Sequence, residues 1–350
     1  MSRYSLPLSL RTKSPLKVNG SHIVCCLGML LAMVSRPGLA QSSGRAFGFL
    51  NQPSFTGLAG LGGVNLTSTG DPMMFLSNPA LSDSLHQKKI SLHYLNFPGD
   101  IQVATLGYLL PGPIESTISL GLQYFNYGEF EGFDDTGFPL GTFSANEFAL
   151  TAGLGKSFGV FRYGVNAKLL GSVLESYQAY ALAMDFGVTY RHPQQDLVLA
   201  VVAKQVGVVL KNYFEDVPLS LPADIRVGAS YKATEMPIRF HLSVRNLIGD
   251  ADAFLAIPQE EQAIGERIFR RVVLGAELLV HESVQLRAGY NHLIRKEFAA
   301  IGGQGMGGFS GGLLFSSKKF AFSYSRMFYH VPGGTHLMGI STNLNELRKF

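Results

Sequence analysis

Cysteine, tryptophan, charge and long apolar runs are all scarce in this sequence, and each shortage excludes something. The two cysteines, Cys25 and Cys26, stand within the first 40 residues, so the rest of the chain has no disulfide, thiolate metal site or cysteine nucleophile. Charged residues make up 15% of the chain, whereas soluble domains carry about 25%. The net charge of +4 includes a basic N-terminus and does not argue for nucleic acid as a partner. After residue 34, no apolar run approaches the roughly 20 residues of a membrane-spanning helix.

The first 40 residues (1–40) are predicted to be a cleaved signal peptide. Four basic residues and no acid come first, namely Arg3, Arg11, Lys13 and Lys17. An apolar stretch follows from Ile23 to Val34, and a small-residue ending closes at Ala40. This stretch is too short to cross a bilayer as a helix, although an uncleaved N-terminal anchor remains the alternative. We therefore expect the chain to be exported.

Polarity alternates from Lys88 onward in segments of about ten residues. The pattern is clearest over 179–190, where one face carries Tyr180, Leu182, Met184, Phe186, Val188 and Tyr190. The other face holds small and polar residues, which suit the lumen of a barrel. In lipid, an exported chain without spanning helices satisfies its backbone only as a closed sheet. We expect an all-β fold, a transmembrane antiparallel β-barrel of about 14 strands over 88–344, with 345–350 as a C-terminal tail.

Connection lengths predict the orientation of the barrel. The connections after every second predicted strand are short, whereas most of the others are long, at 128–142, 208–222, 248–267 and 293–307. Bacterial outer-membrane barrels have short periplasmic turns and longer outer loops. We therefore expect an outer-membrane protein of a Gram-negative bacterium, with the long loops facing the cell exterior and both termini in the periplasm.

Residues 41–87 do not alternate and are rich in Gly, Ser, Asn and Pro, with short apolar pieces between. Their phenylalanines and methionines favour a compact N-terminal plug in the lumen, because a disordered tail would carry fewer of them. A flexible periplasmic extension is the alternative. The predicted plug motif consists of Asp71 and the turn Asn78-Pro79-Ala80, and Asp71 and Asp83 are candidate partners for lumen arginines.

Charged residues recur on the small, polar faces of the predicted strands. These faces would point into the lumen, where charges must be paired. The candidate lumen charge network consists of Arg162, Lys168, Asp185, Arg226, Arg239, Arg245, Glu277 and Arg287. We expect this network to brace the barrel against the plug; a passage for an anionic solute is the alternative.

No group of residues predicts catalysis. The segment Gly303–Gly308 has the glycine spacing of a dinucleotide loop, but it lacks the strand–turn–helix context that such a loop needs. No nucleophile, base and orienting group converge, and the histidines lack the further ligands of a metal site. We expect neither an enzyme nor a cofactor or metal.

Three stretches resemble a known family: 47–63 (FGFLNQPSFTGLAGLGG), 90–108 (ISLHYLNFPGDIQVATLGY) and 122–153, which begins LQYFNYGEFEGF. Together with Asp71-Pro72 and the NPAL segment at 78–81, they resemble the fatty-acid-transporter-like barrels of Gram-negative bacteria. Within that family the likeness is to the PorQ-like barrels of the type IX secretion system of Bacteroidota. It covers most of 46–200 and is looser afterwards.

This resemblance implies a role that alternation of polarity cannot show. PorQ-like barrels are non-enzymatic members of an attachment complex that joins exported cargo to lipopolysaccharide. The implied partners are a PorZ-like surface protein and the complex members PorU and PorV, with outer-membrane lipid around the barrel. The alternative within the wider family is a barrel for uptake of hydrophobic molecules.

Aromatic residues in the predicted outer loops are the candidates for contact with such a partner. The loop at 128–142 mixes acids with phenylalanines, and 248–267 places apolar residues among Asp and Glu. The partner-loop candidates are Phe130, Phe133, Phe138, Phe254 and Leu255. Loops that fold over the barrel mouth would have the same composition, so that alternative stays open.

Overall fold

The computed structural model describes residues 44–97, 99–248, 264–299, 305–330 and 333–347. The predicted signal peptide and the end of the predicted tail lie outside these residues. The described helices have at most eight residues, and none of them is long and apolar enough to cross a membrane.

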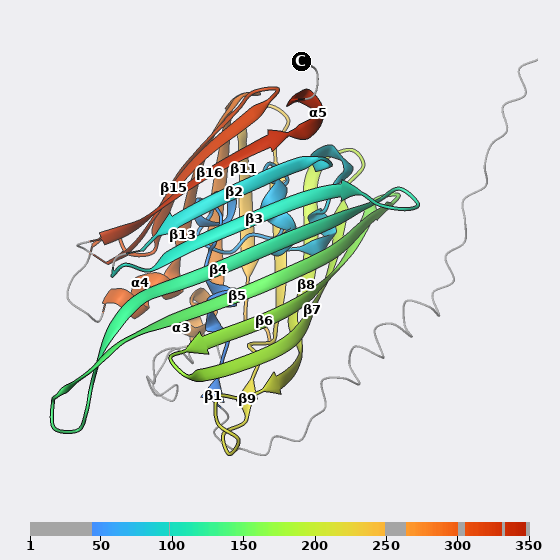
Figure 1. Cartoon of the computed structure of the whole chain (residues 1–350). Helices are drawn as coiled ribbons and strands as arrows, with labels where there is room; N and C mark the ends of the chain where they lie inside the picture. Colours follow the sequence, from blue (N-terminus) through green and yellow to red (C-terminus); the bar gives the residue numbers. More distant parts are fainter. Residues whose placement is uncertain (1–43, 98, 249–263, 300–304, 331–332, 348–350) are drawn as a thin grey trace, which may run out of the picture. The chain divides into compact units, whose positions relative to one another are not determined.

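Fourteen strands form one closed antiparallel barrel, as the sequence predicted (Figure 1). Each strand pairs with its neighbours along the chain, and β16 closes the ring on β2. The barrel strands are β2 (Lys89–Asn96), β3 (Gln102–Pro111), β4 (Ser116–Phe133), β5 (Pro139–Phe158), β6 (Phe161–Leu174), β7 (Tyr177–Arg191), β8 (Asp196–Lys211), β10 (Asp224–Lys232), β11 (Ile238–Val244), β12 (Val272–His281), β13 (Val284–Asn291), β14 (Phe309–Ser316), β15 (Phe320–His330) and β16 (Gly333–Asn343).

Alternation along the strands separates the two faces of the wall. In β7, Leu182, Met184 and Phe186 are exposed on the outside, whereas Ala183 and Asp185 are buried on the inside. Side chains of successive strand residues point to opposite faces, so the apolar set faces lipid and the small or charged set faces the lumen. The lipid and lumen faces predicted for this segment are confirmed.

Two strands extend into a predicted loop. The chain over 128–142 was expected to be an outer loop, but β4 runs to Phe133 and β5 starts at Pro139. The alternating sequence around Glu129, Phe130 and Glu131 satisfies the period of a strand, which its glycines and acids obscure. Two other predicted loops contain short helices. The loop 293–307 contains most of α4 (His292–Ala299), and α3 (Ile264–Phe269) begins within the loop 248–267.

The connections confirm the two unlike ends of the barrel. The first strand begins at Lys89 and the last ends at Asn343, and these residues pair with each other at the end that carries the short turns. The first described residues lie at the opposite end: β1 (Gly44–Arg45) pairs in parallel with β9 (Leu219–Ser220), which belongs to the connection between β8 and β10. The expectation that both termini share one end is therefore wrong for the described part of the chain.

The chain enters the barrel after β1 and fills its interior, where Figure 1 shows the blue segment surrounded by strands. Proline and glycine break this stretch into short helices instead of strands. The helices are η1 (Gly48–Asn51), α2 (Thr56–Ala59), η2 (Pro72–Leu76), η3 (Pro79–Leu81) and η4 (Ser84–His86). We call residues 46–87 the plug.

Apolar side chains of the plug form their own core inside the barrel. Phe55, Met73, Met74 and Phe75 are almost completely buried and cluster with Leu109 of β3. Burying each such side chain contributes about 1.5–3 kcal/mol. A flexible extension would leave these side chains in water, so the packing supports the predicted plug.

Candidate functional site: the plug and the lumen charge network

The plug motif residues hold the short helices in shape. Asp71 precedes η2, and its carboxylate accepts hydrogen bonds from the backbone of Met73 at 2.9 Å and of Gly57 at 3.1 Å. Asn78 precedes η3, and its side-chain oxygen accepts from the backbone of Ala80 at 3.0 Å, with Pro79 at the first helical position. Both are ordinary N-terminal caps.

Asn78 also ties the plug to the barrel. Its side-chain amide donates to the carbonyl of Leu66 at 2.8 Å and to the hydroxyl of Thr189, on β7, at 3.1 Å. The backbone of Pro79 and Ala80 lies directly over Gly164 of β6, where an added Cβ would lie 2.2 Å from the Pro79 carbonyl carbon. The plug motif therefore requires a glycine at position 164 of the wall, because any side chain there would collide with Pro79.

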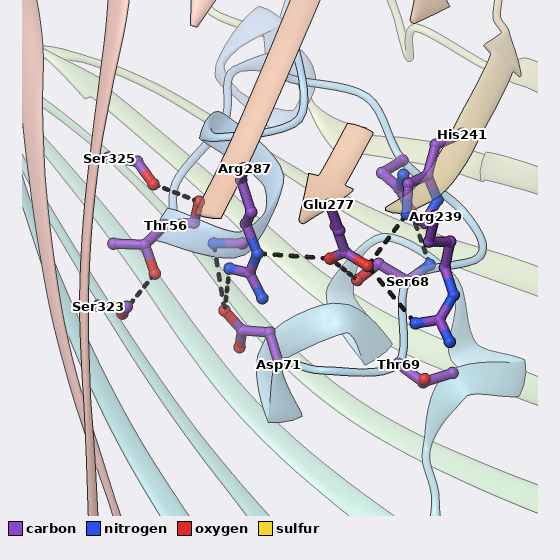
Figure 2. Close-up of polar contacts among 12 residues, drawn as sticks. Thr56, Ser68, Thr69, Asp71, Arg239, His241, Glu277, Arg287, Ser323 and Ser325 are labelled. Atoms are coloured by element: carbon purple, nitrogen blue, oxygen red, sulfur yellow. Dashed lines mark hydrogen bonds and ion pairs between the residues drawn. The ribbon is translucent and has the colours of Figure 1, made fainter. Parts of the chain in front are cut away.

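Glu277 is the centre of a buried charge cluster between the plug and three strands (Figure 2). It accepts a hydrogen bond from the hydroxyl of Ser68 at 2.8 Å, and its second oxygen lies 3.1 Å from Nε2 of His241. Arg287 Nε lies 3.4 Å and Arg239 Nη1 3.6 Å from this carboxylate. One carboxylate thus faces side chains of β11, β13 and the plug together.

Arg287 extends this cluster toward the plug motif. Its Nη1 lies 4.0 Å from Asp71 Oδ2, at the long limit of an ion pair. Arg287, Asp71 and Glu277 are all buried. Removing water from charges is costly unless they are paired. The Arg287 guanidinium between the two carboxylates offsets part of their charge, and Arg239 adds a second positive charge beside Glu277.

Histidines of the wall contact threonines of the plug in two places. Nδ1 of His241 lies 3.1 Å from the hydroxyl of Thr67, and Nδ1 of His93, on β2, lies 3.2 Å from that of Thr56. Thr56 also lies 2.6 Å from the Ser323 hydroxyl and accepts a hydrogen bond from Ser325 on its carbonyl (Figure 2). These contacts fix the plug to strands on more than one side.

A second buried cluster lies on β6, β7 and β8. Lys168 Nζ lies 2.5 Å from Asp185 Oδ2, and the other carboxylate oxygen accepts from the backbone of Gln205 at 2.9 Å. Gln205 has a φ of 58° and the β7–β8 register shifts beside it. Asp185 therefore satisfies a backbone N–H that this bulge removes from the strand ladder. Lys204 Nζ donates to the plug carbonyl of Leu76 at 3.1 Å.

The remaining network residues are divided between plug contacts and wall contacts. Arg162 donates to Asp83 at 2.7 Å, and Asp83 is one of the two plug acids that the sequence offered as partners for lumen arginines. Arg226 lies 2.6 Å from Asp224 and donates to Asn51 of the plug at 2.6 Å.

Arg239 and Arg245, like Arg162, are only partly buried. Arg239 makes its shorter ion pair, 2.7 Å, with the half-exposed Asp196 at the short-turn end. Arg245 follows the last residue of β11 and is partly buried, with its backbone N–H donating to the Arg271 carbonyl at 3.0 Å. Neither was distinguished by sequence from the buried arginines, because alternation gives the face of a residue and not its depth.

Several residues that hold the plug were not selected from the sequence. Ser68, Thr67 and Thr56 are short polar residues in a segment rich in them, and nothing marks which ones reach the wall. His241 and Lys204 carried a usable signal, since both stand on the lumen side of strands with clear alternation.

Of the partner-loop candidates, Phe130 and Phe133 lie on β4 and Phe138 in the turn between β4 and β5. All three are exposed. Phe254 and Leu255 lie outside the described residues. Within the ranges that the structure describes, no three His, Cys, Asp or Glu side chains are grouped as a metal site would require.

Comparisons with known proteins find similarity in structure alone. No family description and no curated protein matches the sequence. The toluene transporter TbuX of Ralstonia pickettii superposes over 84% of this chain and 99% of its own, with a TM-score of 0.52 and 11% identity. The toluene transporter TodX of Pseudomonas putida covers 82% and 97%, with a TM-score of 0.51 and 12% identity.

A FadL homologue of Pseudomonas aeruginosa is similar in structure to about the same degree. It covers 83% of this chain and 98% of its own, with a TM-score of 0.50 and 11% identity. At this identity the likeness concerns the fold alone. The chain has the outer-membrane β-barrel fold of the FadL-type structures.

Proposed function

We propose that this protein is a plugged outer-membrane barrel that acts as a non-catalytic anchor for a protein on the cell surface. The observation that carries the proposal is the way the plug is held. Buried polar contacts link it to β2, β7, β8, β11, β12, β14 and β15, and a partly buried one links it to β6. A lumen filled and bonded on so many sides is suited to a rigid support.

The energetics of the charge clusters favour a plug that stays in place. Withdrawing it would remove Ser68 from Glu277, Asp83 from Arg162 and the Leu76 carbonyl from Lys204. Losing a hydrogen bond to a charged group costs about 1.5–3 kcal/mol. Opening the lumen would break all three bonds together with the apolar core of the plug, which makes the filled barrel the stable state.

Our proposal for the complex and the partner rests on the three sequence stretches that resemble PorQ-like barrels. On that basis we propose membership of a type IX secretion attachment complex, with a PorZ-like protein as the surface partner and PorU and PorV as further members. We also propose that the leader is removed and that the end with the long connections faces the cell exterior. The hairpin of β4 and β5, with exposed Phe130, Phe133 and Phe138, lies at that end.

A second candidate function is a barrel for hydrophobic molecules, and the comparisons favour it over the anchor. The structures with this fold include toluene transporters and a monoaromatic hydrocarbon channel. The outer wall of this chain also has an open apolar hollow of about 840 Å³, lined among others by Leu106, Leu120, Leu150, Leu169 and Leu182. Because these side chains face lipid, the hollow offers a place for an acyl chain or an aromatic molecule beside the wall.

One experiment separates the two functions. The tagged full chain is purified from detergent-solubilised outer membrane of its own bacterium, and in parallel toluene uptake is compared between intact cells with and without the chain. The anchor predicts stoichiometric recovery of a surface protein and equal uptake by the two kinds of cell. Faster uptake by cells with the chain, without any co-purifying protein, would overturn the anchor and support the channel.

A further inference from the structure

The hairpin formed by the far ends of β4 and β5 has no strand beside it. The last β3–β4 pair is Gln102 with Asn126, and the last β5–β6 pair is Ala145 with Leu174. Residues 129–143 therefore pair only within the hairpin, which extends beyond the neighbouring strands in Figure 1. We call this part the projecting hairpin.

Both edges of the projecting hairpin carry backbone groups that no described strand satisfies. An exposed strand edge is a template for pairing with another chain, and an isolated two-stranded hairpin is marginally stable in water. The turn at its tip is nevertheless ordered by hydrogen bonds: the Asp134 carboxylate accepts one from the backbone N–H of Thr136 at 2.9 Å and one from that of Phe138 at 2.8 Å. The hairpin is a formed element with open edges.

Its two faces differ in chemistry. Phe130 pairs with Phe143 across the strands, with ring centroids 5.4 Å apart in a stacked arrangement. Glu131 pairs with Thr142 on the other face. Glu129 lies on this same face, because it stands two residues from Glu131 in the strand. Before the register shift between Gly132 and Phe133, one face therefore carries Phe130 and Phe143 and the other carries Glu129 and Glu131.

The negative charge of the projecting hairpin determines which kind of strand can pair with its edge. Residues 128–144 contain Glu129, Glu131, Asp134 and Asp135 and no lysine or arginine. A second copy of this chain would bring like charges against one another, and like charges on adjacent strands are destabilising. A strand with lysine or arginine on one face and apolar side chains on the other would meet the acids and the phenylalanines in register.

We infer that the projecting hairpin is a strand-addition site for an extended basic segment of the surface partner. The inference rests on the proposed anchoring function and specifies the partner's chemistry. Backbone hydrogen bonds along the free edge supply affinity, and the acidic and aromatic faces supply selectivity.

The test uses the full barrel in nanodiscs and a short peptide in which lysine and valine alternate. A second peptide has the same sequence with alternate backbone amides methylated, so that its charge is kept and its strand hydrogen bonds are lost. The Glu129→Lys, Glu131→Lys double variant is compared with Glu282→Lys, which reverses an exposed acid in the turn at the opposite end of the barrel. Retained heat-modifiability in gels verifies that each variant is folded.

The wild type and Glu282→Lys are expected to bind the lysine–valine peptide equally. The double variant and the methylated peptide are each expected to weaken binding about tenfold or more, a difference of about 1.4 kcal/mol. Equal binding of the methylated peptide would overturn strand addition, and equal binding by the double variant would overturn the hairpin as the site. Concentration-dependent pairing of barrels that the double variant abolishes would assign the edge to a second copy and overturn the inference.

The pull-down distinguishes this inference from the proposed function. If the wild type and the double variant recover the same surface protein equally, the anchor stands and the hairpin inference fails. If the wild type recovers none, the anchoring function itself fails.

Discussion

Ser68 of the plug donates a 2.8 Å hydrogen bond to Glu277 of β12, across 209 residues of sequence. The same carboxylate lies 3.1 Å from His241 and 3.4 Å from Arg287. Plug and wall therefore share one buried acid, and each depends on the other for a satisfied charge. Four variants test the buried contacts of the plug and of the wall around it.

Glu277→Gln keeps the shape of the side chain and removes its charge. Arg287 is then left buried beside Asp71 alone, at 4.0 Å. Breaking a buried ion pair from one side costs about 3–5 kcal/mol, so we expect a loss of that size in the free energy of unfolding in urea. Glu282→Gln, in the exposed turn after β12, should change it by less than about 0.5 kcal/mol. Equal effects of the two substitutions would contradict the bracing role.

Asp185→Asn tests the second cluster. Asparagine can still accept from the backbone of Gln205, but Lys168 loses the counter-charge that lies 2.5 Å away. We expect a loss of about 3–5 kcal/mol. The matched control is Asp196→Asn, which removes a half-exposed partner of Arg239 and should cost about 1 kcal/mol or less. If both variants lose the same small amount, the Lys168–Asp185 pair is not a stabilising contact.

Gly57→Ala tests the fit of the plug motif. An added Cβ would lie 2.5 Å from Asp71 Oδ2, so the alanine must displace the carboxylate that caps η2. We expect a loss of about 1–3 kcal/mol, as for other overpacked positions. Gly265→Ala is the control, because its Cβ would meet nothing within 4 Å in α3 and alanine favours helix. An unchanged urea midpoint for Gly57→Ala would show that the plug can shift at little cost.

Asp83 lies in the plug, outside the membrane-spanning strands, and should make stability depend on pH. Burial by itself raises its pKa, but the hydrogen bond and charge of Arg162 outweigh this, so the pKa is lower than in an unfolded chain. A lowered carboxyl pKa adds stability above the unfolded value of about 4, and this is lost as pH falls through the folded pKa. Wild type should therefore exceed Asp83→Asn in urea stability at neutral pH, with the gap closing below about pH 4. A gap that does not change with pH would contradict this.

The strand count and the assignment of faces followed from the sequence because alternation is a local property. Leu182 is exposed and Ala183 is buried, because adjacent residues of a strand point to opposite faces. The bonds of the plug did not follow, since Ser68 meets Glu277 only after the ring has closed. The extension of β4 to Phe133 was missed because glycines and acids resemble a loop, although Phe130 and Glu131 alternate as a strand does.

The other wrong prediction was that both termini lie at the same end of the barrel. Connection lengths correctly placed the first and last barrel strands at one end. They contain no information on how a segment inside the barrel runs, and the β1–β9 pair reveals that it enters from the opposite end.

Conductance of the full chain in a planar lipid bilayer tests most directly whether the lumen is closed by the plug. With the plug bonded to strands around the ring, we expect insertion of the barrel without a steady conductance. A steady, anion-selective open channel from the same preparation would contradict the filled lumen and the anchoring role built on it.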